Sequence, residues 1–150
     1  RLAAVVRLQQ LKEQRERVSF SAAREAHALQ NKLLGQLQSY SDEYQQLNIA
    51  GADRAVSIAS LRNGSHFMAN LSASIARQQQ QEALAAGRMQ EARRAWEQEM
   101  AKLDSLTSLL ERSRAEEIRE LAHSADLEAV DIWQAVALGA ARRVASQRRS

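Results

Sequence analysis

A strict seven-residue series in the second half of the chain constrains its fold more than any other feature. The members are Met68, Ile75, Glu82, Met89, Trp96, Leu103, Leu110 and Glu117. A companion series lies three residues further along: Leu71, Gln78, Ala85, Ala92, Glu99, Leu106 and Ser113. Alternating steps of three and four residues place both series on one helix face, as the a and d positions of a coiled coil do. The pattern therefore predicts a long helix that pairs with another helix.

The composition favours long helices over a compact core. Proline is absent and aromatic residues make up 4% of the chain. No position therefore forces a kink, and few large side chains are available to fill a globular interior. Ala, Leu, Gln, Glu and Arg dominate, which is typical of coiled coils. We expect an all-α protein without disulfides or thiolate metal sites, because the chain also has no cysteine.

A second stripe of mostly apolar residues occupies the first third of the chain. Every step along it is three or four residues, and its members are Ala4, Leu8, Leu11, Arg15, Val18, Ala22, Ala26, Leu29, Leu33, Leu37, Tyr40, Tyr44 and Leu47. We predict that this stripe packs against the seven-residue series. The predicted seam between the two helices contains Leu8, Leu11, Val18, Leu29, Met89, Trp96, Leu103, Leu106 and Leu110.

The helical pattern lapses between the two stripes. Gly51 and the run Asn63-Gly64-Ser65 are typical of turns, and Ser65 is a suitable helix cap. We therefore predict one domain, an antiparallel coiled-coil hairpin of two long helices. The expected bounds are 2–47 for the first helix, 48–65 for the reversal, 66–141 for the second helix and 142–150 for a frayed basic tail.

The formal net charge of +3 is partly local. Arg142, Arg143, Arg148 and Arg149 follow the last acidic residue, Asp131. One interpretation is a coiled coil that binds nucleic acid, whose affinity would fall steeply with salt. It is the less favoured one, because no basic region continues into a heptad run as in a bZIP protein. No apolar run approaches 18 residues, so we expect no transmembrane segment.

No arrangement of residues in the sequence points to catalysis. Phosphate-binding, nucleophile-elbow and dinucleotide-binding glycine motifs are all absent. Glu120 and His123 form one Glu-x-x-His element, whereas di-iron bundles need two of these and two further glutamates from four helices. We interpret them as a solvated pair. We assign no catalytic residue, cofactor, metal site or small-molecule substrate, and we expect the protein not to be an enzyme.

Two tyrosines lie close to the predicted reversal. Tyr40 and Tyr44 are one helical turn apart, and a hairpin would bring Phe67 near them. One interpretation is seam packing beside the turn. The other is a recognition patch, because tyrosine supplies both apolar area and a polar group.

The run Tyr40-Ser41-Asp42-Glu43-Tyr44 resembles the Tyr-x-x-Glu-Tyr element of FliJ, a family of flagellar type III export proteins. The stretch from Phe67 to Ile75, then Trp96, then Leu110-Glu111-Arg112, follow at the spacing of that family. The resemblance extends over roughly residues 2–131.

The resemblance implies a cytoplasmic antiparallel coiled coil, similar to the γ stalk of rotary ATP synthases and held at the inner membrane by the export apparatus. The partners it implies are the hexameric export ATPase FliI, the export gate protein FlhA and export chaperones. The paired terminal segments would enter the ATPase ring. The family's gate-binding patch, carried onto matching positions, falls on Leu37, Tyr40, Tyr44, Phe67 and Leu71.

Two related functions share the same periodicity. A stalk protein of the injectisome, or a generic coiled-coil adaptor, would show similar stripes. The aromatic residues near the predicted reversal favour the flagellar protein.

Overall fold

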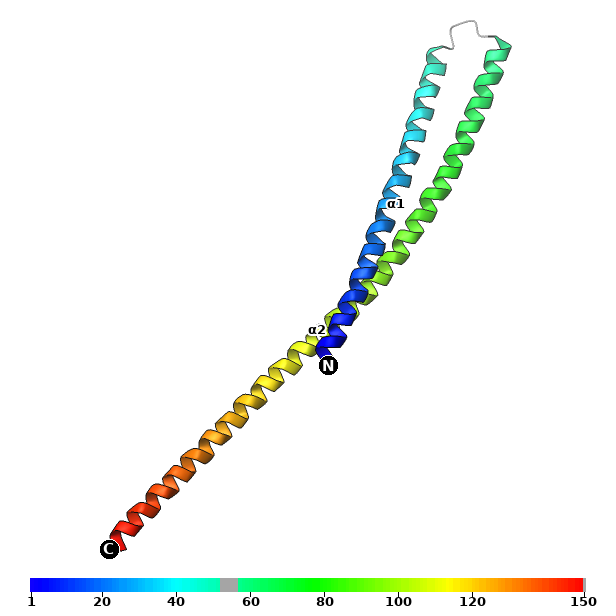
Figure 1. Ribbon diagram of the computed structural model, residues 1–150. Coiled ribbons are helices and arrows are strands. Elements are labelled where there is room, and N and C mark those ends of the chain that lie inside the picture. Colours follow the sequence, from blue (N-terminus) through cyan, green and yellow to red (C-terminus); the bar gives the residue numbers. More distant parts are fainter. Residues whose placement is uncertain (52–56, 150) are drawn as a thin grey trace. The chain divides into compact units, whose positions relative to one another are not determined.

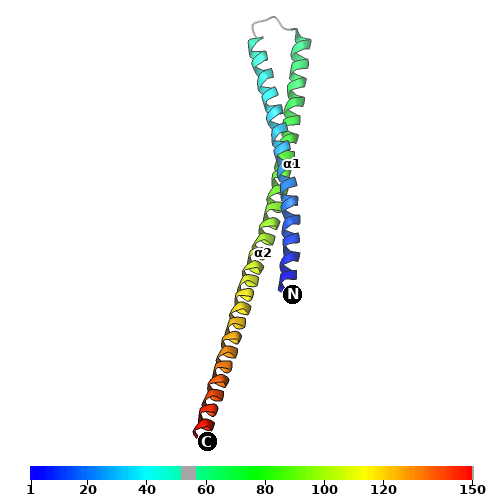
Figure 2. The ribbon, with the colours of Figure 1, turned by 60° about the vertical axis from the view of Figure 1, so that its left-hand side comes forward.

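The computed structural model describes residues 1–51 and 57–149, and two helices account for nearly all of them. Helix α1 spans Leu2–Ala50 and helix α2 spans Ile58–Arg149. The described residues contain no β-strand. Between Arg7 and Leu103 the two helices lie side by side and run in opposite directions (Figures 1 and 2). The prediction of an all-α, antiparallel two-helix hairpin is confirmed.

Both helices extend further into the predicted reversal than the sequence pattern suggested. Helix α2 begins at Ile58, whereas the predicted start was near residue 66. Ser57 caps it, because its hydroxyl accepts the Ser60 backbone N–H at 3.1 Å and its carbonyl accepts the Leu61 N–H at 3.1 Å. The cap predicted at Ser65 was therefore wrong.

The run Asn63-Gly64-Ser65, which was expected to form a turn, is likewise helical. At the other end of the reversal, α1 ends at Ala50, and the Gly51 N–H donates to the Leu47 carbonyl at 2.9 Å. The remainder of the predicted reversal, residues 52–56, lies outside the described residues.

The C-terminal end is also helical for longer than predicted. A frayed tail was expected from residue 142, but α2 continues to Arg149. Alanine and arginine are strong helix formers, and no residue after Gly139 is glycine or proline. Arg148 and Arg149 in the last turn also interact favourably with the negative end of the helix dipole.

The chain divides into two compact units. One consists of residues 7–103, which form the paired hairpin. The other combines residues 1–6 with the part of α2 from Asp104 onward. The organisation into a single domain stays a prediction.

Burial is slight in both units, as expected where a helix has at most one neighbouring helix. Among the described residues, only Val6, Gln9, Leu71 and Ala85 are classed as buried. The two series predicted on α2 nevertheless coincide with its less exposed face. The members from Met68 to Ser113 are all half-buried or buried, including Met89, Trp96, Leu103, Leu106 and Leu110.

In α1 the less exposed face differs from the predicted one. Leu8, Leu11, Val18 and Leu29 are 55, 60, 62 and 55% exposed, so their assignment to the seam was wrong. The residues that are half-buried or buried between Gln9 and Tyr44 are Gln9, Glu13, Glu16, Phe20, Ala23, His27, Gln30, Leu34, Leu37, Ser41 and Tyr44.

These residues also recur at steps of three and four, so two stripes of α1 have helical periodicity. The two stripes share Leu37 and Tyr44, which are half-buried. From Leu8 to Leu33 the apolar stripe is exposed to water, and the stripe with many polar residues faces α2. The physical reason lies in the partners that α2 offers to the polar stripe.

Candidate functional site

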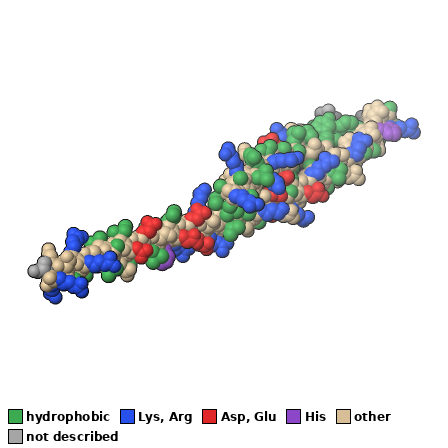
Figure 3. Space-filling view, turned by 60° about the horizontal axis from the view of Figure 1, so that its bottom comes forward, with side chains coloured by type: hydrophobic (Ala, Val, Ile, Leu, Met, Phe, Trp, Pro, Cys, Tyr) green, Lys and Arg blue, Asp and Glu red, His purple; other side chains and the backbone are tan. Residues whose placement is uncertain are grey.

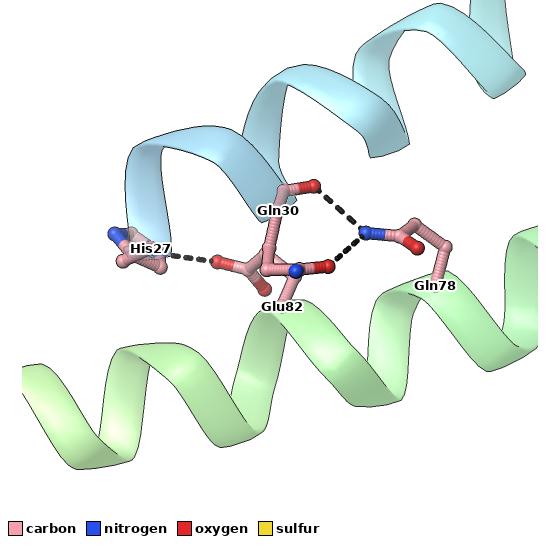
Figure 4. Close-up of polar contacts among 4 residues, drawn as sticks. All are labelled: His27, Gln30, Gln78 and Glu82. Carbon is pink, nitrogen blue, oxygen red and sulfur yellow. Dashed lines mark hydrogen bonds and ion pairs between the residues drawn. The ribbon is translucent and has the colours of Figure 1, made fainter. Parts of the chain in front are cut away.

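Polar side chains meet across the middle of the hairpin. Figure 4 shows His27 and Gln30 of α1 pointing towards Glu82 and Gln78 of α2. The His27 Nε2 lies 2.7 Å from Glu82 Oε1. The Gln78 amide donates to the backbone carbonyl of Gln30 at 3.0 Å and to its side-chain oxygen at 2.7 Å. Each of these polar groups therefore has a partner across the seam, as groups removed from water require.

A second polar contact joins the helices nearer the N-terminus of α1. The buried Gln9 donates its side-chain amide to both the backbone carbonyl and the carboxylate of Glu99. Lys102 lies 3.5 Å from the same carboxylate. The Gln9 hydrogen bond, aided by the charge of Lys102, lowers the pKa of Glu99 below its usual 4.5.

An aromatic stack lies between these two polar contacts. The rings of Phe20 and Trp96 are nearly parallel, 3° apart in orientation, with centroids separated by 5.7 Å. The Trp96 indole N–H donates to Glu13 Oε1 at 3.0 Å. The stack requires Phe20 to face α2, and this is one reason why the predicted stripe of α1 lies on another side.

We name the contacting pairs Gln9–Glu99, Glu13–Trp96, His27–Glu82 and Gln30–Gln78 the polar seam. The residue numbers of the partners on α2 decrease as those on α1 increase, as expected for antiparallel helices. A slip by one residue along either helix would separate polar groups from their partners. The contacts of the polar seam are therefore compatible with this register alone, and we infer that they help to specify it, as polar groups do in some coiled coils.

Sequence analysis did not find this seam. The available signal was the set of polar members in the α2 series, Gln78, Glu82 and Glu99. Such positions need polar partners at matching positions on the other helix.

At the end of the hairpin near the turn, three aromatic side chains form a cluster. The rings of Tyr44 and Phe67 are 4.7 Å apart at an angle of 49°. Those of Tyr40 and Phe67 meet edge to face at 6.0 Å and 77°. We call Tyr40, Tyr44 and Phe67 the aromatic cluster. Tyr40 is 51% exposed and Phe67 36% exposed, whereas Tyr44 is half-buried.

The aromatic cluster also explains a glycine within α2. A Cβ added at Gly64 would lie 3.1 Å from the hydroxyl oxygen of Tyr44. That separation is tighter than ordinary contact, so the absence of a side chain at Gly64 makes room for Tyr44. Seam packing therefore describes Tyr44, and the recognition patch stays a prediction. Tyr44 packs between the helices, and Tyr40 presents half of its surface to solvent.

The remaining members of the predicted patch are less accessible. Leu37 is half-buried, and Leu71 is 7% exposed. The structure brings Tyr40, Tyr44 and Phe67 together, and leaves Tyr40 and Phe67 as the members of the patch most open to a partner.

No metal site was found in the described part of the chain. No three His, Cys, Asp or Glu side chains there gather closely enough to hold an ion. No helix among the described residues is long and apolar enough to cross a membrane. The accessible features of the molecule are instead the aromatic cluster and the faces of its helices.

A comparison with known protein families finds similarity over most of the chain. The model of the family described as "Flagellar FliJ protein" matches residues 1–125. No curated protein and no solved structure matches the chain. The matched residues include the polar seam and the aromatic cluster, and they end before the last turns of α2.

Proposed function

The chain belongs to the flagellar FliJ protein family, and we propose that it is a non-catalytic stalk and adaptor of the flagellar type III export apparatus. In this proposal it inserts into the ring of the export ATPase FliI and couples that ring to the export gate protein FlhA and to export chaperones. It would work in the cytoplasm, held at the inner membrane by the apparatus. The paired-helix unit over residues 7–103 supports this proposal, because a stalk needs stiffness along its length and no internal site.

The observation that carries the contact with the gate is the half-exposed aromatic cluster. Aromatic side chains dominate the energetics of many interfaces when a partner buries them. Tyr40 has half of its surface open and a hydroxyl available to a partner. We therefore propose Tyr40 and Phe67 as the contacting side chains of the patch. Tyr44, Leu37 and Leu71 would hold those two in place from between the helices.

Replacing Tyr40 with alanine tests the contact. We expect binding to the purified cytoplasmic part of the gate protein to weaken by about 2 kcal/mol, or roughly thirtyfold, which is the scale of an interface anchor. Isothermal titration calorimetry would measure it. Binding to the export ATPase should be unchanged, because the proposal assigns that contact to the paired terminal segments. Motility of cells carrying the variant should fall.

Leu61→Ala supplies the matched control. Leu61 lies on α2 before the aromatic cluster and is 61% exposed. Its replacement should leave gate binding unchanged. Equal binding by Tyr40→Ala and the wild-type chain would show that the patch is wrong for this protein. Equal weakening in both variants would show that the surface is not specific to the aromatic cluster.

A further inference from the structure

The last part of α2 lies beyond the residues that match the family. That match ends at residue 125, and α2 continues to Arg149. Every residue from 114 to 149 is exposed except Gly139, which is half-buried. This stretch therefore presents its whole circumference to its surroundings.

One side of this stretch is mainly apolar, and its two polar members are Arg143 and Gln147 near the end of the helix. At about 100° per residue, the following residues share one half of the helix surface: Ala129, Ile132, Trp133, Val136, Ala137, Ala140 and Val144. We call them the C-terminal apolar face. Trp133 is 76% exposed, Ile132 65% and Val136 60%. The large apolar area left open to water indicates that this face has a partner.

The charges around this face are almost all of one sign. Between Ala129 and Arg149 the only acidic residue is Asp131, against four arginines. On the same helical wheel, Arg148 borders the C-terminal apolar face at one edge and Arg143 lies within its arc beside Ile132. Arg142 and Arg149 lie on the opposite side of the helix. Figure 3 shows basic side chains gathered at this end of the chain beside apolar ones. The partner must therefore combine an apolar interior with negative charge at its surface.

We propose that residues 129–149 form an interfacial helix that binds the surface of an anionic lipid bilayer. The C-terminal apolar face would enter the boundary between headgroups and acyl chains, and the arginines would contact lipid phosphates. A helix with one mainly apolar side, several arginines and a tryptophan has the composition of helices that lie in this plane. Tryptophan side chains are also enriched at the level of the lipid headgroups.

The residue types disfavour two other partners. A helix of a second copy would call for a narrow seam flanked by charges of both signs, whereas this face is broad and the charged residues within it and at its edge are arginines. The phosphates of a nucleic acid would contact the arginines, because they are bound by charge. They would leave Ile132, Trp133 and Val136 exposed to water. A bilayer uses both features.

The test measures binding of the full chain to vesicles. Vesicles containing phosphatidylglycerol in phosphatidylcholine are compared with vesicles of phosphatidylcholine alone, by co-sedimentation and tryptophan emission. We expect binding to the anionic vesicles, weakening with added salt, and little binding to the neutral ones. The emission should shift to shorter wavelength, and that shift should be lost in Trp133→Phe, which retains Trp96.

Two exposed positions supply a matched pair. Val136 lies on the C-terminal apolar face and Leu138 on the opposite side, and they are 60 and 61% exposed. Val136→Gln should weaken vesicle binding about tenfold, because it removes a buried aliphatic group. Leu138→Gln should leave the affinity within about twofold, because that side of the helix stays in water. Arg148→Gln should weaken binding about fivefold. Both apolar side chains are mostly exposed, so neither replacement opens a cavity in a core.

Several results would overturn the proposal. These are absence of binding to anionic vesicles at low salt, equal effects of Val136→Gln and Leu138→Gln, or an unshifted emission spectrum. A molar mass in solution that halves in Val136→Gln would show that a second copy covers the face. Oligonucleotide binding without vesicle binding would assign the arginines to nucleic acid. Binding to the gate and the ATPase is measured separately, so this proposal and the proposed function can fail independently.

Discussion

Truncation of Trp96 to alanine tests whether the aromatic stack and the polar seam hold the hairpin together. Trp96 is half-buried, stacks on Phe20 and donates to Glu13. Truncating a fully buried tryptophan costs about 3–5 kcal/mol. Because part of this side chain is exposed, we expect a loss of about 2–3 kcal/mol in the free energy of unfolding. About 1 kcal/mol of that belongs to the ring stack.

Thermal unfolding followed by circular dichroism measures the effect. For a chain of this length the loss corresponds to a fall of about 5–10 °C in the melting temperature. The chain offers a matched control in Trp133→Ala, because Trp133 is on the same helix and is 76% exposed. That variant should differ from the wild-type protein by less than about 0.5 kcal/mol.

A double-mutant cycle isolates the contact between the rings. Phe20→Ala, Trp96→Ala and the double variant should give a coupling energy of about 1 kcal/mol. If Trp96→Ala melts at the same temperature as Trp133→Ala, Trp96 does not pack between the helices and the register described above is incorrect. A coupling energy of zero would show that the ring stack does not stabilise the hairpin, without contradicting the register.

Glycines within the helices give a second prediction: Gly35→Ala should stabilise the hairpin by about 0.5–1 kcal/mol, because nothing lies within 4 Å of the added Cβ. Gly64→Ala should gain less, or lose stability, because its Cβ would lie 3.1 Å from the Tyr44 hydroxyl oxygen; urea titration of the two variants compares them, and an equal gain would contradict the close approach. The third prediction concerns pH: because the pKa of Glu99 is lowered in the folded protein, its contribution is fully present above its usual pKa of 4.5 and is lost as the pH falls through the folded value. Gln9→Leu removes the largest cause of that shift, so the variant should lose less stability than the wild-type protein between neutral and acidic pH; equal losses in urea midpoint would refute the role of this hydrogen bond.

The sequence by itself determined the helical hairpin and the phase of α2. Without proline, and with apolar residues recurring every seven positions from Met68 to Leu110, a long helix with one buried stripe is the structure the pattern allows. These features depend on spacing along one chain segment, so periodicity alone is enough to find them.

The ends of the helices were harder to predict, because a cap depends on hydrogen bonds that compete locally. Asn63-Gly64-Ser65 has the residue types of a turn, yet Ser57 supplies the cap and the helix passes through Gly64. Glycine lowers helix stability by only about 1 kcal/mol. Packing of Tyr44 over Gly64 offsets that cost, and this contact is between helices, so the local pattern cannot reveal it.

Only the tertiary structure decided which side of α1 faces α2. Periodicity favoured the stripe through Leu8, Leu11 and Val18, because the apolar side of a single helix is the side expected to be buried. The hairpin instead turns Gln9, His27 and their neighbours inward, where they meet the polar members of the α2 series. Leaving those half-buried α2 groups without partners would have cost part of their hydration. The choice is a property of the pair of helices, because a hydrogen bond across the seam exists only once both helices and their register are present.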